Sequence, residues 1–206
     1  VKGATTLYQV GYGYDAAGRV SAVNSTTDAL QNSTYAYDRL GRLTTVAGAQ
    51  AESFTYGPTG NILSSSTLGA YAYSPTKVHA VTAAGGASYS YDANGNMVAG
   101  AGRAFTWDAD NRLATVASGS GTSTYSYDPD GQRIARQTAA GVTRFYGKLL
   151  EVQPDGARVK HVYAGPMVVA RKSPAGTFWM HQDRLGSIKL LTSAAGRSGA
   201  PHCTST

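Results

Sequence analysis

A string of the form Tyr-x-Tyr-Asp-x-x-Gly recurs along the chain and limits the possible folds more than any other feature. It reads YGYDAAGR at 12–19, YAYDRLGR at 35–42, YSYDANGN at 89–96 and YSYDPDGQ at 125–132. Seven units align on their first aromatic residue, which is Tyr12, Tyr35, Phe54, Tyr71, Tyr89, Phe105 or Tyr125. Steps of roughly 20 residues fit two short strands and two connections. The sequence therefore predicts an all-β fold, an antiparallel β-meander of repeated hairpins that forms a single continuous, curved strip.

The composition agrees with many short strands joined by tight turns. Among 206 residues there are 25 Gly and 14 Tyr, and only 15% of the residues are charged. Tyrosine buries its ring and keeps a polar tip, which suits a half-buried sheet surface. We interpret the tyrosines as scaffold, with ligand stacking as the alternative. The one stretch with a helical pattern is TTDALQNS at 26–33, where we expect a single helical turn.

The Asp-x-x-Gly core predicts a turn closed by a left-handed residue. Aspartate at the first position accepts hydrogen bonds from the backbone two residues on, and glycine at the fourth supplies a positive φ. A positive φ is expected at Gly18, Gly41, Gly60, Gly95, Gly131 and Asn111. Eleven four-residue turns are expected to start at Asp15, Asp38, Gly57, Ser74, Asp92, Asp108, Asp128, Gln153, Ser173, Asp183 and Ser193. The turn at Ser74 fits worst, and we expect it to be distorted.

A β-bulge beside each turn fixes which side chains meet across the hairpin. The expected cross-strand pairs are Tyr14–Val20, Tyr12–Ala22, Tyr37–Leu43 and Tyr127–Ile134. The arginines near the turns are then expected to form a solvated rim; they are Arg19, Arg42, Arg112 and Arg133. The net charge of +6 is accordingly interpreted as this rim rather than as a nucleic-acid stripe.

A search for chemistry predicts no catalytic, cofactor-binding or metal-binding residue. The four histidines, His79, His161, His181 and His202, show no metal-ligand spacing. His202 and Cys203 are adjacent but lack the third group that a nucleophilic pair needs. Each turn aspartate is a single carboxylate, which favours capping over calcium binding. No apolar run is long enough to predict a membrane span.

The repeats resemble the YD repeats of the rearrangement-hotspot (Rhs) family. The segments YAGPMVVARK at 163–172 and DRLGSIKLLTSAAGR at 183–197 resemble the start of that family's core region. We therefore expect a repeat array at 1–140, the last repeats and a core-like region at 141–197, and an irregular tail at 198–206. The resemblance implies a β-strip that curves into a hollow shell around a C-terminal toxin, and a secreted or cell-surface location.

The chain departs from that family in its last residues. The family's self-cleaving members carry an aspartyl site beyond the core segment, whereas the last acidic residue here is Asp183. We therefore expect a non-enzymatic structural fragment whose partners are the rest of a longer Rhs chain or its toxin cargo. The alternative is a surface array that binds glycan or another partner, or that associates with itself through sheet edges. Neither nucleic acid nor a membrane is expected as a partner.

Overall fold

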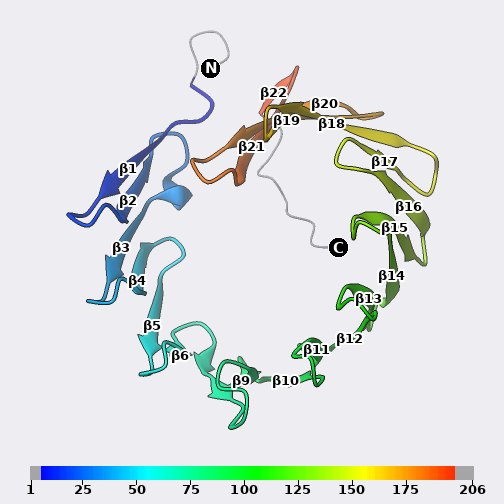
Figure 1. Ribbon diagram of the computed structural model, residues 1–206. Coiled ribbons are helices and arrows are strands. Elements are labelled where there is room, and N and C mark those ends of the chain that lie inside the picture. Colours follow the sequence, from blue (N-terminus) through cyan, green and yellow to red (C-terminus); the bar gives the residue numbers. More distant parts are fainter. Residues whose placement is uncertain (1–5, 198–206) are drawn as a thin grey trace. The chain divides into compact units, whose positions relative to one another are not determined.

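The structure, a computed structural model, describes residues 6–197 and consists almost entirely of β-strands and tight turns (Figure 1). Among these residues the single helix is the three-residue 3-10 helix η1, Ala29–Gln31, inside the predicted helical stretch. Asp28 caps it by accepting a hydrogen bond from the Leu30 N–H. The predicted all-β antiparallel meander is confirmed.

The chain divides into two compact units, Val1–Gly102 and Arg103–Thr206. The strands of the first unit are β1 Val10–Tyr14, β2 Val20–Ser25, β3 Ser33–Tyr37, β4 Leu43–Gly48, β5 Glu52–Tyr56, β6 Ile62–Ser65, β7 Gly69–Ala70, β8 Ala72–Tyr73, β9 Val81–Ala84, β10 Ala87–Tyr91 and β11 Met97–Gly100. The strands of the second are β12 Arg103–Trp107, β13 Leu113–Ser118, β14 Gly121–Tyr127, β15 Arg133–Thr138, β16 Gly141–Tyr146, β17 Leu150–Val152, β18 Arg158–Ala164, β19 Met167–Ser173, β20 Gly176–Gln182, β21 Ile188–Ser193 and β22 Gly196–Arg197.

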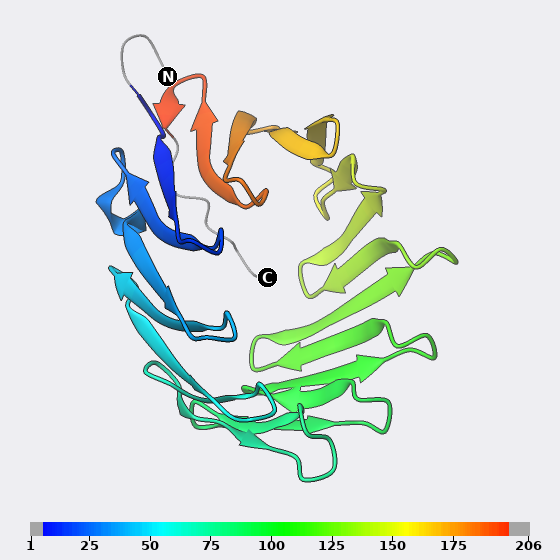
Figure 2. The same cartoon turned by 60° about the vertical axis from the view of Figure 1, so that its left-hand side comes forward.

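Within each unit, strands pair with their neighbours in chain order. In the second unit β12 to β22 follow one another, and Figure 2 shows its hairpins side by side. In the first unit β1 to β7 form one sheet and β8 to β11 belong to another. The prediction of one continuous strip is therefore wrong at Tyr71. The strands on either side of Tyr71 have two residues each, and pairing changes there from β6 to β9.

The turns form where the Asp-x-x-Gly pattern places them. All six predicted left-handed residues have φ between 59° and 91°. In eight turns the fourth residue donates its N–H to the first residue's carbonyl; these turns start at Asp15, Asp38, Gly57, Asp92, Asp108, Asp128, Gln153 and Asp183. The turns at Ser173 and Ser193 are tighter, because each serine pairs directly with the glycine three residues on. The segment after Ser74 is a wider loop, as expected, closed by the Ser74 N–H donating to the Ala80 carbonyl.

The predicted bulge of Gly18 and Arg19 against Asp15 is confirmed, because the Asp15 N–H donates to the Arg19 carbonyl and Tyr14 pairs with Val20; the strand then has a second irregularity that was not predicted. Tyr14 pairs with Val20 and Gly13 with Ala22, so Ser21 is the unpaired residue. Tyr12 consequently pairs with Val23, and the prediction of Ala22 is wrong.

The predicted register holds in the second hairpin and fails in the seventh. Tyr37 pairs with Leu43 as expected. Tyr127 pairs with Arg133, and the prediction of Ile134 is wrong. The reason is that every Tyr-Asp turn keeps the same geometry, so the partner is always six residues after the tyrosine.

The two faces of the hairpins differ in chemistry. One face, here called the aromatic face, carries both aromatic residues of each unit, as Tyr35 and Tyr37 show, and apart from the exposed Tyr14 these side chains are half-buried. The opposite face carries small residues, and its hydroxyls pair across strands: Thr55 with Ser64 at 2.6 Å and Thr106 with Thr115 at 2.7 Å. Buried hydrophobic residues are few; they are Ala84, Val159, Ala170 and Leu190. Contacts between successive hairpins must therefore contribute much of the stability.

Candidate functional site

Each Tyr-Asp turn begins with a carboxylate that caps the backbone. Asp15 Oδ1 accepts hydrogen bonds from the Ala17 N–H at 3.0 Å and from the Arg19 N–H at 2.9 Å. The same Oδ1 contact to the fourth following N–H recurs at Asp38, Asp92, Asp108, Asp128 and Asp183. The predicted capping role of the turn aspartates is thereby confirmed.

The arginine after the turn glycine binds the same aspartate. Arg19 Nε donates to Asp15 Oδ2 at 2.7 Å, and Arg42 Nε donates to Asp38 Oδ2 at 2.6 Å. In the second unit Arg112 Nε donates to Asp108 Oδ2 at 2.7 Å. The prediction that these arginines form a solvated rim is wrong. The turn places the guanidinium next to the carboxylate that caps the same turn. The arginine therefore forms an ion pair with that carboxylate instead of being surrounded by water alone.

The same arginines reach forward to the next repeat. The Arg19 guanidinium lies 4.5 Å from the centroid of the Tyr37 ring, and its Nη1 donates to the Asp38 carbonyl at 3.5 Å. Arg42 stacks in the same way on Tyr56, at 4.6 Å. Such cation–π contacts attract the guanidinium electrostatically to the ring face. Each arginine therefore connects its own turn to the following hairpin.

The second tyrosine of each unit bonds back to the preceding repeat. Tyr37 OH donates to the Val20 carbonyl at 2.8 Å. The equivalent bonds are Tyr56 to Leu43 at 2.6 Å, Tyr73 to Ile62 at 2.7 Å, Tyr91 to Val81 at 2.9 Å and Tyr127 to Leu113 at 2.8 Å. Near the end of the described chain Gln182, which precedes Asp183, donates its Nε2–H to the Val168 carbonyl instead. We call this set of aspartate, arginine and tyrosine contacts the turn ladder.

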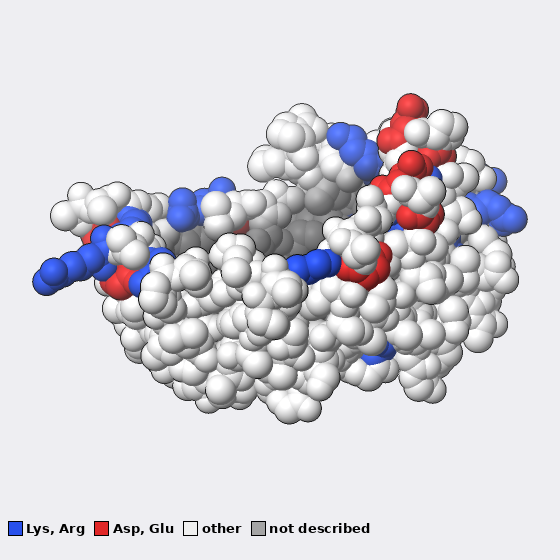
Figure 3. All heavy atoms as spheres, turned by 60° about the horizontal axis from the view of Figure 1, so that its bottom comes forward, with Lys and Arg blue, Asp and Glu red and all other residues white. Residues whose placement is uncertain are grey.

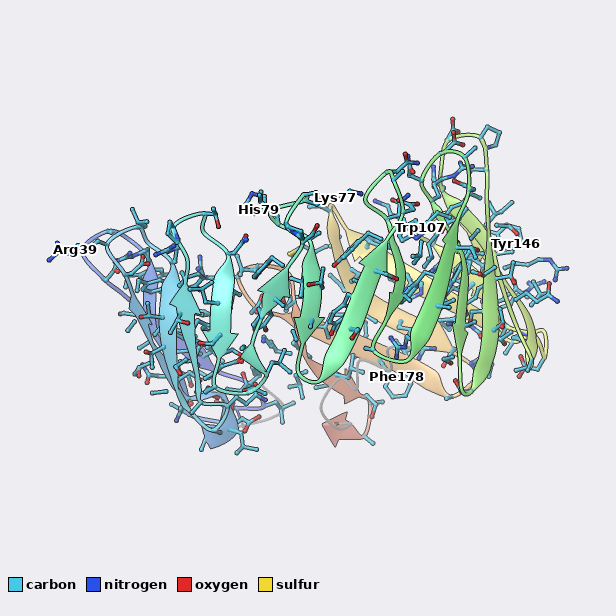
Figure 4. The ribbon with its side chains drawn as sticks, turned by 90° about the horizontal axis from the view of Figure 1, so that it is seen from below. Arg39, Lys77, His79, Trp107, Tyr146 and Phe178 are labelled. Atoms are coloured by element: carbon cyan, nitrogen blue, oxygen red, sulfur yellow. The ribbon has the colours of Figure 1, made fainter. Side chains whose placement is uncertain are left out.

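The ladder continues where the arginine is replaced. Lys77, from the wide loop, donates through Nζ to the Asp92 carbonyl at 2.7 Å. Asn61 donates to the Val78 carbonyl and pairs with His79 Nδ1 at 2.7 Å. Figure 4 shows Arg39, Lys77 and His79 at the same end of the first unit's strands. The ladder therefore tolerates several polar side chains, provided that they reach the next turn.

Arg133 differs from the other predicted rim arginines. Its guanidinium lies 4.5 Å from the Phe145 ring centroid and 5.7 Å from that of Tyr125. The residue that follows the turn glycine in this unit is Gln132, so Arg133 occupies a strand position opposite Tyr127. It thus stacks on aromatic rings of the sheet and stays exposed to solvent, so the prediction that it reaches water is confirmed.

The ladder keeps its carboxylates charged. The pKa values of Asp15, Asp38 and Asp108 are lowered from the ordinary 3.8, first because the backbone N–H of the arginine four residues on donates to the carboxylate. Partial burial opposes this shift but does not outweigh it, and the arginine side chain adds to it. In Figure 3 acidic groups, in red, lie next to basic groups, in blue, at several places on the face shown.

We expect these carboxylates to make the fold sensitive to acid. A carboxylate whose pKa is lower in the folded state stabilises the fold above its ordinary pKa, and this contribution is lost as the pH falls through the lowered value. The urea midpoint should therefore be constant from pH 7 to 5 and should fall below about pH 4. Asp38→Asn should weaken this dependence. A urea midpoint at pH 3 equal to that at pH 7 would contradict the assignment.

The histidines do not come together into a site. His161 Nε2 lies 3.0 Å from Glu151 Oε1, and His181 Nε2 lies 2.9 Å from Thr192 Oγ1. No group of three histidine, cysteine or acidic side chains able to hold a metal ion occurs within residues 6–197. His202 and Cys203 lie outside the described residues.

Asp183 caps its turn through the Leu185 and Ser187 N–H groups.

Sequence reasoning found the turn aspartates but missed the contacts between repeats. The signal was available, because an aromatic residue directly precedes most turn aspartates and an arginine follows several turn glycines at a fixed distance.

Within the described part of the chain, no helix is long and apolar enough to cross a membrane.

The chain belongs to a family of shell-forming repeat proteins. The family model described as Teneurin YD-shell matches residues 2–163, and the chain is thus a member of the Teneurin YD-shell family. This agrees with the resemblance to Rhs repeats drawn from the turns. None of the curated proteins compared with this sequence matches it.

Solved structures of Tc toxins share the fold. A Tc holotoxin pore from Photorhabdus luminescens, carrying a TccC3 mutation, is 15% identical over 91% of this chain, with a TM-score of 0.50. A crystal structure of TcdB2-TccC3-TEV is 14% identical over 91% of this chain, with the same TM-score of 0.50. This chain covers 14% of the length of each.

Proposed function

We propose that this chain is a non-catalytic wall segment of a secreted or cell-surface YD-repeat shell that encloses a C-terminal toxin. The observation that carries the proposal is the turn ladder. Each hairpin is tied to the next by an arginine that reaches forward, as Arg19 does to Tyr37, and by a tyrosine hydroxyl that reaches back. Such contacts can be repeated from hairpin to hairpin, as an extended wall requires. The rest of a longer chain and the enclosed toxin are the proposed partners.

The division of the chain remains part of this proposal. We propose residues 1–140 as the repeat array and 141–197 as the last repeats and the start of the core-like region; the irregular tail expected at 198–206 lies outside the described residues. The proposal that this chain has no catalytic activity rests on the hydrogen bonds that the turn carboxylates accept. Acid proteolysis needs two carboxylates that share a proton. The turn aspartates accept backbone N–H bonds instead, and the lowered pKa values of Asp15, Asp38 and Asp108 make these three poor general acids.

Protease treatment of the complete protein that contains this segment tests the proposal. We expect the polypeptide that follows the segment to resist proteinase K in the native protein and to be degraded after unfolding in urea. Before protease is added, the mass of the segment should stay unchanged for a day between pH 4 and 8. Degradation of the following polypeptide in the native protein would refute enclosure. A discrete cleavage product that Asp183→Asn abolishes would refute the non-catalytic role.

A further inference from the structure

The face opposite the aromatic face changes its chemistry within the second unit. From β12 to β15 it presents uncharged side chains, among them Thr106, Thr115 and Thr124 in paired positions and Ala135 opposite Ser126. From β16 onward it presents lysines, arginines and large aromatic residues. Charge is also unevenly distributed along the sequence. Eleven of the 18 lysines and arginines follow residue 130, whereas three of the 12 acidic residues do.

Strand register brings these residues together on one face. Directly paired residues point to the same side of a sheet. One row runs across β16 to β19 as Tyr146, Leu150, Lys160 and Lys172. A second row is Arg144, Val152 and Arg158, and a third is Val162, Ala170 and Trp179. We call the set of Arg144, Tyr146, Arg158, Lys160, Lys172 and Trp179 the cationic patch.

The four cations of the patch are exposed and have no ion pair within residues 6–197. The acidic residue of these strands, Glu151, lies on the aromatic face, where it contacts His161 at 3.0 Å. Lys160 and Lys172 are directly opposite each other on adjacent strands. Like charges in that position destabilise a sheet. Binding of an anion between them would relieve this repulsion.

Two aromatic side chains flank the cations and remain open to solvent. Tyr146, labelled at the end of β16 in Figure 4, is 57% exposed, and Trp179 on β20 is 52% exposed. They are four strands apart, which is about 19 Å at the usual strand spacing. Flat aromatic faces of this kind pack against the apolar face of a sugar ring, while the lysines and arginines between them bind its acidic groups.

We propose that the cationic patch binds a linear anionic polysaccharide. Single-stranded nucleic acid is less well matched, because that mode stacks successive bases on neighbouring aromatic side chains, and Tyr146 and Trp179 are too far apart for that. An anionic membrane is less well matched, because Leu150 and Val152, which lie between the cations, are half-buried, and Val162 is the one exposed aliphatic side chain in the three rows. The patch goes beyond the shell role and does not depend on it.

Binding of the purified chain to heparin, as a linear sulfated polysaccharide, tests the proposal. We expect heparin to bind. Its affinity should fall as NaCl is added, because salt screens the ion pairs between the polysaccharide and solvent-exposed cations. Lys160→Ser with Lys172→Ser should weaken binding about tenfold. The matched control is Arg39→Ser with Arg103→Ser, which removes the same charge from exposed positions outside the patch and should leave binding unchanged.

Trp179 supplies a direct signal. The chain has two tryptophans, so Trp107→Phe leaves Trp179 as the reporter, and heparin should change its fluorescence. Equal losses in the two double variants would overturn the proposal, since net charge alone would then explain binding. Unchanged Trp179 fluorescence, or tighter binding to a dT oligonucleotide or to phosphatidylserine vesicles than to heparin, would also overturn it. None of these results bears on enclosure of a toxin, which the protease experiment tests separately.

Discussion

Replacing Tyr37 with alanine should lower the free energy of unfolding by about 3 kcal/mol, because the ring makes three kinds of contact at once. The ring is half-buried on the aromatic face, and its hydroxyl donates to the Val20 carbonyl at 2.8 Å. The Arg19 guanidinium covers it at 4.5 Å. The alanine variant loses the apolar burial, the link to the preceding hairpin and the stacking partner of Arg19. Urea denaturation followed by circular dichroism measures the change.

Two further variants separate these contributions. Tyr37→Phe keeps the ring and removes only the hydrogen bond, so we expect a loss of about 1 kcal/mol. Tyr14 is the matched control, because it occupies the same position in the first repeat and is 52% exposed. Tyr14→Ala should cost less than about 1 kcal/mol. If Tyr14→Ala and Tyr37→Ala were equally destabilising, the contacts between repeats could not be what holds the hairpins together.

The local backbone could be predicted from the sequence because it depends on neighbouring residues. A positive φ at Gly131 follows from the four residues of its own turn, and so does the capping by Asp128. Asn111 replaces a turn glycine and still adopts a φ of 59°, since asparagine tolerates the left-handed region. The bulge was also predictable in kind. The second irregularity, which leaves Ser21 unpaired, was not, because turn chemistry alone does not determine pairing that far along the strand.

Contacts between repeats could not be predicted from single turns. The sequence shows Arg19 beside Asp15, but the stacking of Arg19 on Tyr37 depends on how the next hairpin is set against the first. The cationic patch was missed for a similar reason. Lys160 and Lys172 are twelve residues apart in the chain, and only the register of β18 and β19 places them opposite each other. The sequence shows that cations are enriched after residue 130, but it does not show which of them share a face.

Gly100 identifies a position where packing, rather than backbone conformation, requires glycine. It ends β11 directly opposite Tyr89, and its φ is not in the left-handed region. A Cβ added there would overlap the Tyr89 ring at Cδ1 and lie 3.0 Å from Met97 Sδ. In three other repeats the equivalent residue is valine: Val23 opposite Tyr12, Val46 opposite Tyr35 and Val116 opposite Phe105. The Tyr89 ring therefore lies over the backbone at Gly100, in the space that a valine fills elsewhere.

We expect Gly100→Val to lower the free energy of unfolding by about 3 kcal/mol, since overpacking forces the ring of Tyr89 out of its position. Gly119 is the control: it also has no left-handed φ, and no other group lies within 4 Å of an added Cβ, so Gly119→Val should change stability by less than about 0.5 kcal/mol. A double-mutant cycle in urea distinguishes the clash from a backbone effect. If the ring is the obstacle, Tyr89→Ala combined with Gly100→Val should be less destabilising than the sum of the single changes, because the alanine removes the atoms that the valine meets. Additive single effects would instead show that glycine is required at position 100 for a reason other than the Tyr89 ring.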